Sequence, residues 1–148
     1  MLLAVGADHA GFPLKVAIVE RLVAQGHEVV DLGTTDASVS VDWPDTGRGV
    51  GEAVRRGDAD LGVAVCGSGI GVAIAANKVP GIRAATVHDV TSARLAREHN
   101  HANVLCLGAR LTGVAVALEA LDAWLEASPA GDRHARRVAM LEPTEERP

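Results

Sequence analysis

The stretch that decides the fold is residues 61–78, which read LGVAVCGSGIGVAIAANK. The stretch opens with a continuous apolar run, as expected of a strand that is buried on both faces of a parallel sheet. A glycine-rich turn comes next, and residues 70–78 have the composition of a helix. A buried strand that leads through a tight turn into a helix is typical of α/β proteins, in which helices cover a parallel sheet.

The same alternation of strand and helix extends in both directions from this segment. We expect strands at residues 2–5, 28–32, 61–65, 82–87 and 103–107. We expect helices to begin at Pro13 and to cover residues 45–56, 70–78, 89–98 and 112–127, with a further basic helical turn in the tail. The sequence thus predicts a three-layer α/β/α sandwich around a Rossmann-like, five-stranded parallel sheet.

The first expected helix has the clearest pattern. Leu14, Ile18 and Leu22 recur every four residues and define one apolar face. Pro13 suits the first helical turn, where its missing N–H has no helical partner to lose. Gly26 can adopt the left-handed conformation that commonly ends a helix. We therefore expect this helix to end just before Gly26.

Length and composition limit the possible functions. With 148 residues the chain has the size of one domain, so we expect a single domain over residues 1–148, with 142–148 as a flexible tail. Aromatic residues make up only 2% of the chain, which argues against base stacking on single-stranded nucleic acid. The net charge of −5 argues against phosphate polymers in general, because they bind basic surfaces. Nucleic acid is therefore not an expected partner.

Neither a membrane nor an oxidising compartment is indicated. The N-terminus lacks the features of a signal peptide, and no stretch approaches the roughly 20 apolar residues of a membrane span. Cys66 and Cys106 are too few for a disulfide framework and lack the spacing of a zinc or redox site. Cys106 lies in an apolar run and is expected to be structural. We expect two free thiols in a cytoplasmic protein with no membrane partner.

Residues that follow the expected strands are candidates for a binding site, because ligands of open parallel sheets bind beyond the carboxyl ends of the strands. Asp8 and His9 follow the first strand. They can contact a ligand, or Asp8 can cap the next helix while His9 is a solvated loop residue, and position alone leaves both interpretations open. The polar connection 33–44 is long for a compact domain, which predicts that it forms a wall of the site.

The turn after the third strand contains Cys66, Gly67, Ser68, Gly69 and Gly71. Glycines allow successive amides to point inward, and the start of a helix adds partial positive charge, so this turn can hold an anion or an oxyanion. The same field favours a thiolate at Cys66, which would act as a base or a nucleophile. The alternative is a small buried cysteine beside a tight turn. The third glycine comes one residue too early for the dinucleotide-binding fingerprint.

Basic residues gather in the C-terminal half of the chain. His99 lies near the end of an expected helix, where it can bind a ligand or only complement the helix dipole. Arg133 and Arg137 are four residues apart and share a helix face, with His134 between them. Two guanidiniums on one face can bind a phosphate, although a solvated basic turn has the same pattern. In a chain that is acidic overall, this cluster favours an anionic small ligand.

Five segments carry a recognisable pattern in a fixed order. They are GADHAGFPLK (6–15), DLGT (31–34), CGSGIGVAIAANKVPGIRAA (66–85), SARLAREHNHANVLCLGAR (92–110) and GDRHARRV (131–138). Together they resemble the ribose-5-phosphate isomerase B type of sugar-phosphate isomerases, a family that includes the galactose-6-phosphate isomerase subunits. The resemblance implies interconversion of an aldose phosphate and a ketose phosphate through a cis-enediolate, without a metal or an organic cofactor.

The resemblance also implies a catalytic role for individual residues. Cys66 is similar to the base that moves the proton between C1 and C2, and His99 to the residue that helps to open the sugar ring. Asp8 would handle a hydroxyl proton, and Asn100 would hold the open chain. Ser68 would stabilise the enediolate oxygen, together with the amides around three glycines of the same turn: Gly67, Gly69 and Gly71.

Phosphate binding and assembly are implied in the same way. The phosphate would be bound by basic side chains from several parts of the sequence: His9, Arg133 and Arg137, with help from His134 and Arg110. In this family a second subunit completes the pocket, so the resemblance implies a homodimer, or a dimer of dimers, with shared active sites.

The chain departs from the family pattern at Trp43, because residues 42–44 read Asp-Trp-Pro where many members have Asp-Tyr-Pro. We expect Trp43 to contact the substrate, and the change leaves the sugar open: ribose 5-phosphate, or a tetrose or hexose phosphate. Residues 72–75 contain no acid, whereas some relatives use a glutamate there as the base, so this departure favours Cys66. A non-catalytic sugar-phosphate or nucleotide-binding module is the alternative from a different class.

Overall fold

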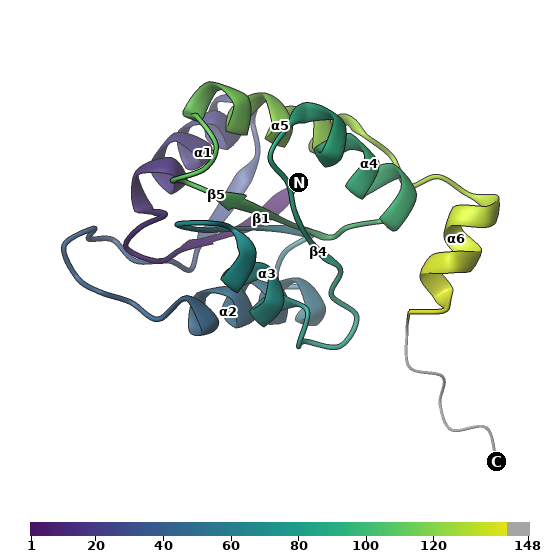
Figure 1. Cartoon of the computed structure of the whole chain (residues 1–148), viewed down its shortest axis with the longest axis horizontal. Coiled ribbons are helices and arrows are strands. Elements are labelled where there is room, and N and C mark those ends of the chain that lie inside the picture. Colours follow the sequence, from purple (N-terminus) through teal and green to yellow (C-terminus); the bar gives the residue numbers. More distant parts are fainter. Residues whose placement is uncertain (142–148) are drawn as a thin grey trace, which may run out of the picture.

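The computed structural model describes residues 1–141 and contains a five-stranded parallel sheet (Figure 1). The spatial order of the strands is β2-β1-β3-β5-β4. Their bounds are β1 (Leu2–Ala7), β2 (Glu28–Asp31), β3 (Leu61–Cys66), β4 (Ala84–Thr86) and β5 (Val104–Gly108). The flexible tail expected at residues 142–148 lies outside the described part of the chain.

Helices cover both faces of the sheet and give the predicted three layers (Figure 1). One layer contains α1 (Phe12–Ala24), α4 (Val90–Asn100) and α5 (Val114–Glu126), and the other contains α2 (Trp43–Arg56) and α3 (Ile70–Ala76). The last helix, α6 (Asp132–Ala139), lies beside α4 and outside these layers. The predicted α/β/α sandwich is confirmed. No helix within residues 1–141 is long and apolar enough to cross a bilayer.

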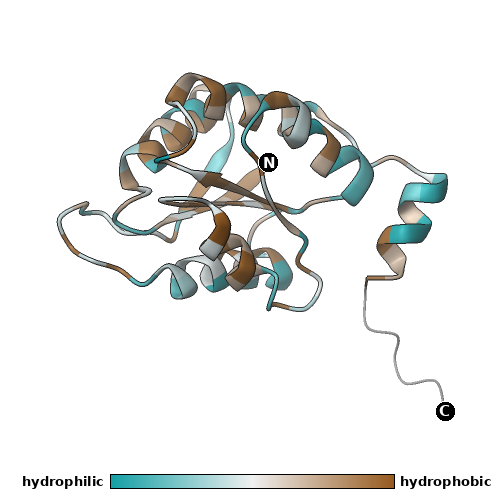
Figure 2. Cartoon of the chain, viewed as in Figure 1, coloured by the Kyte–Doolittle hydropathy of each residue, from teal (hydrophilic) through white to brown (hydrophobic). Residues whose placement is uncertain are grey.

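Each face of the sheet has its own apolar core, because successive side chains of a strand point to opposite faces. Val63 and Val65 of β3 pack with α1, α4 and α5, around the fully buried Trp124. Ala64 and Cys66 of the same strand face α2 and α3. Figure 2 shows apolar residues concentrated on the strands and on the inner sides of the covering helices, whereas α6 is largely hydrophilic and buries none of its residues.

The ends of several elements differ from the predicted ones for physical reasons. The strand predicted over 82–87 is reduced to β4, because this edge strand pairs only with β5. The helix predicted to start at residue 45 starts at Trp43, with the proline that follows it in the first turn. The helix predicted to end at residue 98 continues to Asn100 and is stopped by His101 in a left-handed conformation (φ 50°). Gly26 has the left-handed φ of 79° that was predicted after α1.

Candidate active site

The candidate active site begins where β1, β3 and β5 end. Ala7 pairs with Val65, and Cys66 pairs with Gly108, so the three strands end level with one another. The residues that follow each strand therefore meet at the carboxyl edge of the sheet, as predicted.

The glycine turn after β3 is held tightly against the end of β5. Gly69 has a left-handed φ of 77°, and a Cβ at this position would lie 2.9 Å from the carbonyl carbon of Leu107. Gly108 in turn approaches the backbone of Ser68, where an added Cβ would lie 2.5 Å from the carbonyl carbon. Both positions therefore require glycine, because a side chain would collide with backbone that cannot move aside.

Cys66 lies at the boundary between this turn and the apolar core. Its side chain packs in the α2/α3 core, and the residue is only 4% exposed. The backbone N–H of Gly69 donates to the sulfur at 3.1 Å, and such a donor stabilises negative charge on it. Cys66 is therefore a buried cysteine beside a tight turn that also receives a polar contact from the glycine cradle. The two interpretations of the sequence do not exclude each other.

Ser68 faces the start of α3, where its Oγ accepts a hydrogen bond from the N–H of Ile70 at 3.3 Å. Arg110 follows β5 and lies against the turn, where its backbone N–H donates to the carbonyl of Gly67 at 2.9 Å. The guanidinium of Arg110 lies over Gly67, 3.4 Å from where a Cβ would be. The turn thus has a hydroxyl and a cation beside its amides, which suits an anionic or developing anionic oxygen.

The turn after β1 supplies Asp8 and His9. Asp8 is 5% exposed, and its Oδ1 accepts a hydrogen bond from the N–H of Gly11 at 2.8 Å. This contact fixes the turn that leads into α1, but Asp8 does not cap the helix as predicted, because the N-cap residue is Gly11 and has no side-chain capping bond. His9 is half-buried and its Nδ1 accepts from the N–H of Val41 at 3.2 Å. His9 is thus a partly exposed turn residue with one ring nitrogen engaged by the loop.

The loop between β2 and α2 lies beside this edge of the sheet. Val41 joins it to His9, and Trp43 follows at the start of α2. The indole ring of Trp43 lies against the first turn of α3, where a Cβ on Gly71 would be 2.8 Å from the ring. Trp43 is 42% exposed, so its ring is accessible to a ligand.

The remaining predicted residues form a second cluster, between the end of α4 and α6. His99, Asn100, His134 and Arg137 line a cavity of about 350 Å³. The rings of His99 and His134 stack with 4.2 Å between their centroids, and Arg133 donates from its Nε to Nε2 of His134 at 3.3 Å. Partial removal from water lowers the pKa of His134, and the positive charges of its neighbours lower it further.

The two clusters lie at opposite edges of the sheet. Gly62 pairs with Val104, just after the end of α4, whereas Cys66 pairs with Gly108. At about 3.3 Å per residue, these pairs are about 13 Å apart along the strands. Figure 1 shows the loop before α2 and the α6 helix at opposite ends of the molecule. A single chain therefore does not bring Cys66 together with His99.

Sequence reasoning missed the backbone N–H of Val41, because a loop without periodic pattern does not reveal which of its amides meets another turn. It also missed Lys15, which is buried beneath the same loop. Within residues 1–141, no three His, Cys, Asp or Glu side chains are grouped so that they could hold a metal ion.

Known proteins share both the sequence and the fold. Residues 3–141 match the family model described as Ribose/Galactose Isomerase. Ribose-5-phosphate isomerase B of Escherichia coli is 45% identical over 145 residues, which are 98% of this chain and 97% of the relative. D-erythrulose-4-phosphate isomerase of Pectobacterium atrosepticum is 40% identical over 139 residues, which are 94% of this chain and 91% of the relative.

A solved structure of Clostridium thermocellum ribose-5-phosphate isomerase B superposes with a TM-score of 0.93 at 49% identity, and the match covers 95% of each chain. Together with the glycine turn at the carboxyl edge of the sheet, these matches define an α/β sugar-phosphate isomerase. The chain belongs to the ribose/galactose isomerase family. The resemblance seen in the sequence is thereby confirmed.

Proposed function

We propose that the chain interconverts ribose 5-phosphate and ribulose 5-phosphate. The observation that carries the proposal is the sulfur of Cys66, which accepts an N–H from Gly69 at the mouth of the glycine turn. A proton next to a carbonyl is weakly acidic, so its removal needs both a base and donors aimed at the developing oxyanion. This turn offers both. The relative and the solved structure named for ribose 5-phosphate support the choice of sugar.

The proposed reaction moves one proton between neighbouring carbons of the open-chain sugar. The thiolate of Cys66 takes the proton from C2 of the aldose, and the electron pair forms the C1–C2 double bond while the carbonyl oxygen becomes negative. The thiol then returns the proton to C1, and the C2 oxygen becomes the new carbonyl. Asp8 transfers the hydroxyl proton between the two oxygens. Ser68 and the amides of the turn stabilise the enediolate.

Substrate binding in this proposal uses both edges of the sheet, in two copies of the chain. His9 and Arg110 lie at the carboxyl edge, whereas the other phosphate-binding candidates lie at the amino edge: Arg133, His134 and Arg137. In a homodimer, the amino-edge cluster of one protomer, including His99 and Asn100, would complete the carboxyl-edge site of its partner. Ile70 and Ile74 on α3 are 51% and 53% exposed, which provides apolar surface for such an interface.

We regard residues 1–148 as a single catalytic domain that acts in the cytoplasm. The two free cysteines, Cys66 and Cys106, support this compartment because reducing conditions keep thiols unpaired.

A second candidate is the same reaction on a tetrose or hexose phosphate. The specific observation in its favour is Trp43, whose ring packs on Gly71 at the wall of the site. The bulky indole ring of Trp43 changes the space that is available to the carbon chain of the sugar. The relative named for D-erythrulose 4-phosphate shows that the family includes other sugars.

The test combines a panel of sugar phosphates with a pair of cysteine variants. In D₂O the unmodified protein should introduce deuterium at the reacting carbon of ribose 5-phosphate. The Cys66→Ala variant should lose about 1,000-fold in kcat, as expected for the removal of a general base. The Cys106→Ala variant is the matched control, because it removes the other buried thiol away from the site.

Each outcome of this test has a defined meaning. Faster turnover of a tetrose or hexose phosphate than of ribose 5-phosphate would transfer the proposal to that sugar. Binding of sugar phosphates without any deuterium incorporation would show a non-catalytic module. Equal activity of Cys66→Ala and the unmodified protein would remove the thiolate mechanism.

A further inference from the structure

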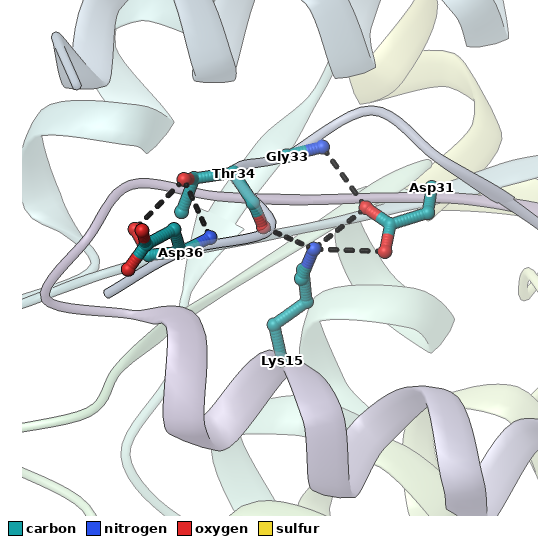
Figure 3. A network of polar contacts seen from close by, with 5 residues as sticks. All are labelled: Lys15, Asp31, Gly33, Thr34 and Asp36. Carbon is teal, nitrogen blue, oxygen red and sulfur yellow. Dashed lines mark hydrogen bonds and ion pairs between the residues drawn. The ribbon is translucent and has the colours of Figure 1, made fainter. Parts of the chain in front are cut away.

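Lys15 is a buried lysine that the proposed chemistry does not use. It lies on α1 and is only 2% exposed. Its ammonium donates to both carboxylate oxygens of Asp31 at 2.8 Å and to the carbonyl of Thr34 at 2.6 Å (Figure 3). An ammonium has three N–H donors, so the three acceptors satisfy it fully. Burial of an ammonium without partners costs free energy, so the buried Lys15 depends on these three contacts.

These contacts fix the start of the loop over residues 32–42. Asp31 ends β2 and also accepts the N–H of Gly33 at 3.0 Å. The N–H of Thr34 donates to the carbonyl of Ala7 at 3.0 Å. A Cβ on Gly33 would lie 2.3 Å from the nitrogen of Ala7, so the loop runs directly against the end of β1. Lys15 therefore joins α1 to the end of β2 and to the start of the loop. At this point the loop packs against Ala7, the residue before Asp8.

The middle of the loop is ordered by its own polar contacts. Thr34 exchanges hydrogen bonds with the backbone of Asp36: its Oγ1 accepts from the N–H at 3.1 Å and donates to the carbonyl at 3.0 Å (Figure 3). The carboxylate of Asp36 accepts the N–H of Ser38 at 2.8 Å and its hydroxyl at 2.7 Å. The N–H of Val39 also donates to the carbonyl of Asp36 at 3.4 Å, so these contacts order the loop as far as residue 39, two residues before Val41.

The far end of the loop determines the state of His9. The N–H of Val41 donates to Nδ1 of His9 at 3.2 Å. A ring nitrogen that accepts a hydrogen bond carries no proton, so the neutral ring must carry its proton on Nε2. Nε2–H is then the donor that His9 presents to a ligand. The position of one loop amide therefore selects the tautomer of a candidate phosphate-binding residue.

We infer that Lys15 is a positioning residue for His9. Its ion pair with Asp31 holds the loop so that the amide of Val41 keeps His9 in the Nε2–H tautomer, ready to donate to an anionic oxygen of the substrate. The last step rests on the proposed function, but the link from Lys15 to the His9 ring does not. This link can be tested without a substrate.

The test uses the Lys15→Met variant, which removes the charge and keeps the unbranched side chain. Long-range ¹H–¹⁵N spectra of the full chain report the tautomer of each histidine, with the His9 signals assigned through His9→Asn. The unmodified chain should show Nε2–H at His9, and Lys15→Met should populate the Nδ1–H tautomer. Hydrogen exchange at the Val41 amide should become about tenfold faster, because the loop opens more often.

Activity provides a second measurement, because displacement of His9 should lower the rate of catalysis. We expect kcat/KM of Lys15→Met to fall about tenfold or more, since a displacement of about 1 Å can cost about 100-fold. A chain that turns over no sugar phosphate would contradict the proposed function. The tautomer and the exchange rate would still decide the role of Lys15.

Arg21→Met is the matched control, because Arg21 also lies on α1 and also loses an ion pair, with Asp122 on α5. We expect this variant to leave the His9 tautomer and Val41 exchange unchanged. If Lys15→Met does not fold, Asp31→Asn replaces it, because Asp31 is 42% exposed and tolerates the change better. The inference is wrong if the folded Lys15 or Asp31 variant keeps both readouts, or if Arg21→Met changes them equally.

Discussion

At the scale of single residues, the two cysteines show how position alone separates similar groups. Both lie on the α2/α3 side of the sheet. Cys106 is fully buried in the middle of β5, where burial raises the pKa of its thiol and the nearby Cys66 raises it further. This confirms the structural role expected for Cys106. Cys66, at the end of β3, instead receives an N–H from Gly69.

Alkylation by iodoacetamide should therefore distinguish the two thiols in the folded protein. We expect Cys66 to be labelled first and Cys106 to react at least about 100-fold more slowly, because the buried thiol reacts only through opening of the core. Mass spectrometry of the peptides over time gives both rates. Equal rates under native conditions would show that Cys66 has no special environment.

At the scale of elements, the link from β3 to α3 depends on a glycine conformation combined with a close approach. Gly69 and Gly26 share nearly the same left-handed φ, 77° and 79°. An added Cβ at Gly26 meets nothing within 4 Å, whereas at Gly69 it would lie 2.9 Å from the backbone of Leu107. A side chain at Gly26 would therefore suffer only conformational strain, whereas a side chain at Gly69 would suffer strain and a steric collision.

Alanine substitutions at these two glycines should differ in cost. Gly26→Ala should lower the free energy of unfolding by about 1 kcal/mol, from the left-handed conformation alone. Gly69→Ala should lower it by about 3 kcal/mol, because overpacking against backbone adds to the same strain. Denaturant unfolding of both variants measures the difference. Equal costs would mean that the turn can move away from β5.

Sequence patterns predict the layers because the central strands are buried on both faces and are therefore continuously apolar, as in β3. They predict β4 poorly, because Ile82 and Val87 are apolar and buried without being part of the strand. Lys15 was detectable in principle, since a charge that falls on the buried stripe of α1 needs a partner. The contact between Val41 and His9 was not detectable, because it depends on the path of an irregular loop.

At the scale of the whole molecule, the candidate residues form two clusters, which are the half-sites of the proposed homodimer. Strand ends predict the carboxyl-edge group, with Cys66, because parallel strands end together. The amino-edge group follows from helix direction: α4 runs back across the sheet, so His99 arrives at the opposite edge. Sequence spacing does not show this separation, because it gives no direction in space.

Mixed dimers should reveal whether the half-sites come from different copies. Cys66→Ala and His99→Ala should each be inactive alone. Coexpressed, they should regain about one quarter of the unmodified activity, because half of the randomly formed symmetric dimers are mixed and each mixed dimer has one intact site of two. Turnover per protomer measures the recovery. No recovery, with mixed dimers present by native mass spectrometry, would place the whole site within one chain.

The helix α6 carries Arg133 and Arg137 without burying any side chain. Within the described residues its neighbourhood is held by the stacked rings of His99 and His134 and by two contacts of Ala130. The N–H of Ala130 donates to the carbonyl of Glu98 at 2.8 Å, and its carbonyl lies 2.7 Å from Nε2 of His101. In the proposed homodimer, dilution would separate the two copies, so substrate binding should weaken well before any strand unfolds. Assays at nanomolar protein should then give a higher KM than assays at micromolar protein. The circular dichroism spectrum should be the same at both concentrations, because the secondary structure is retained.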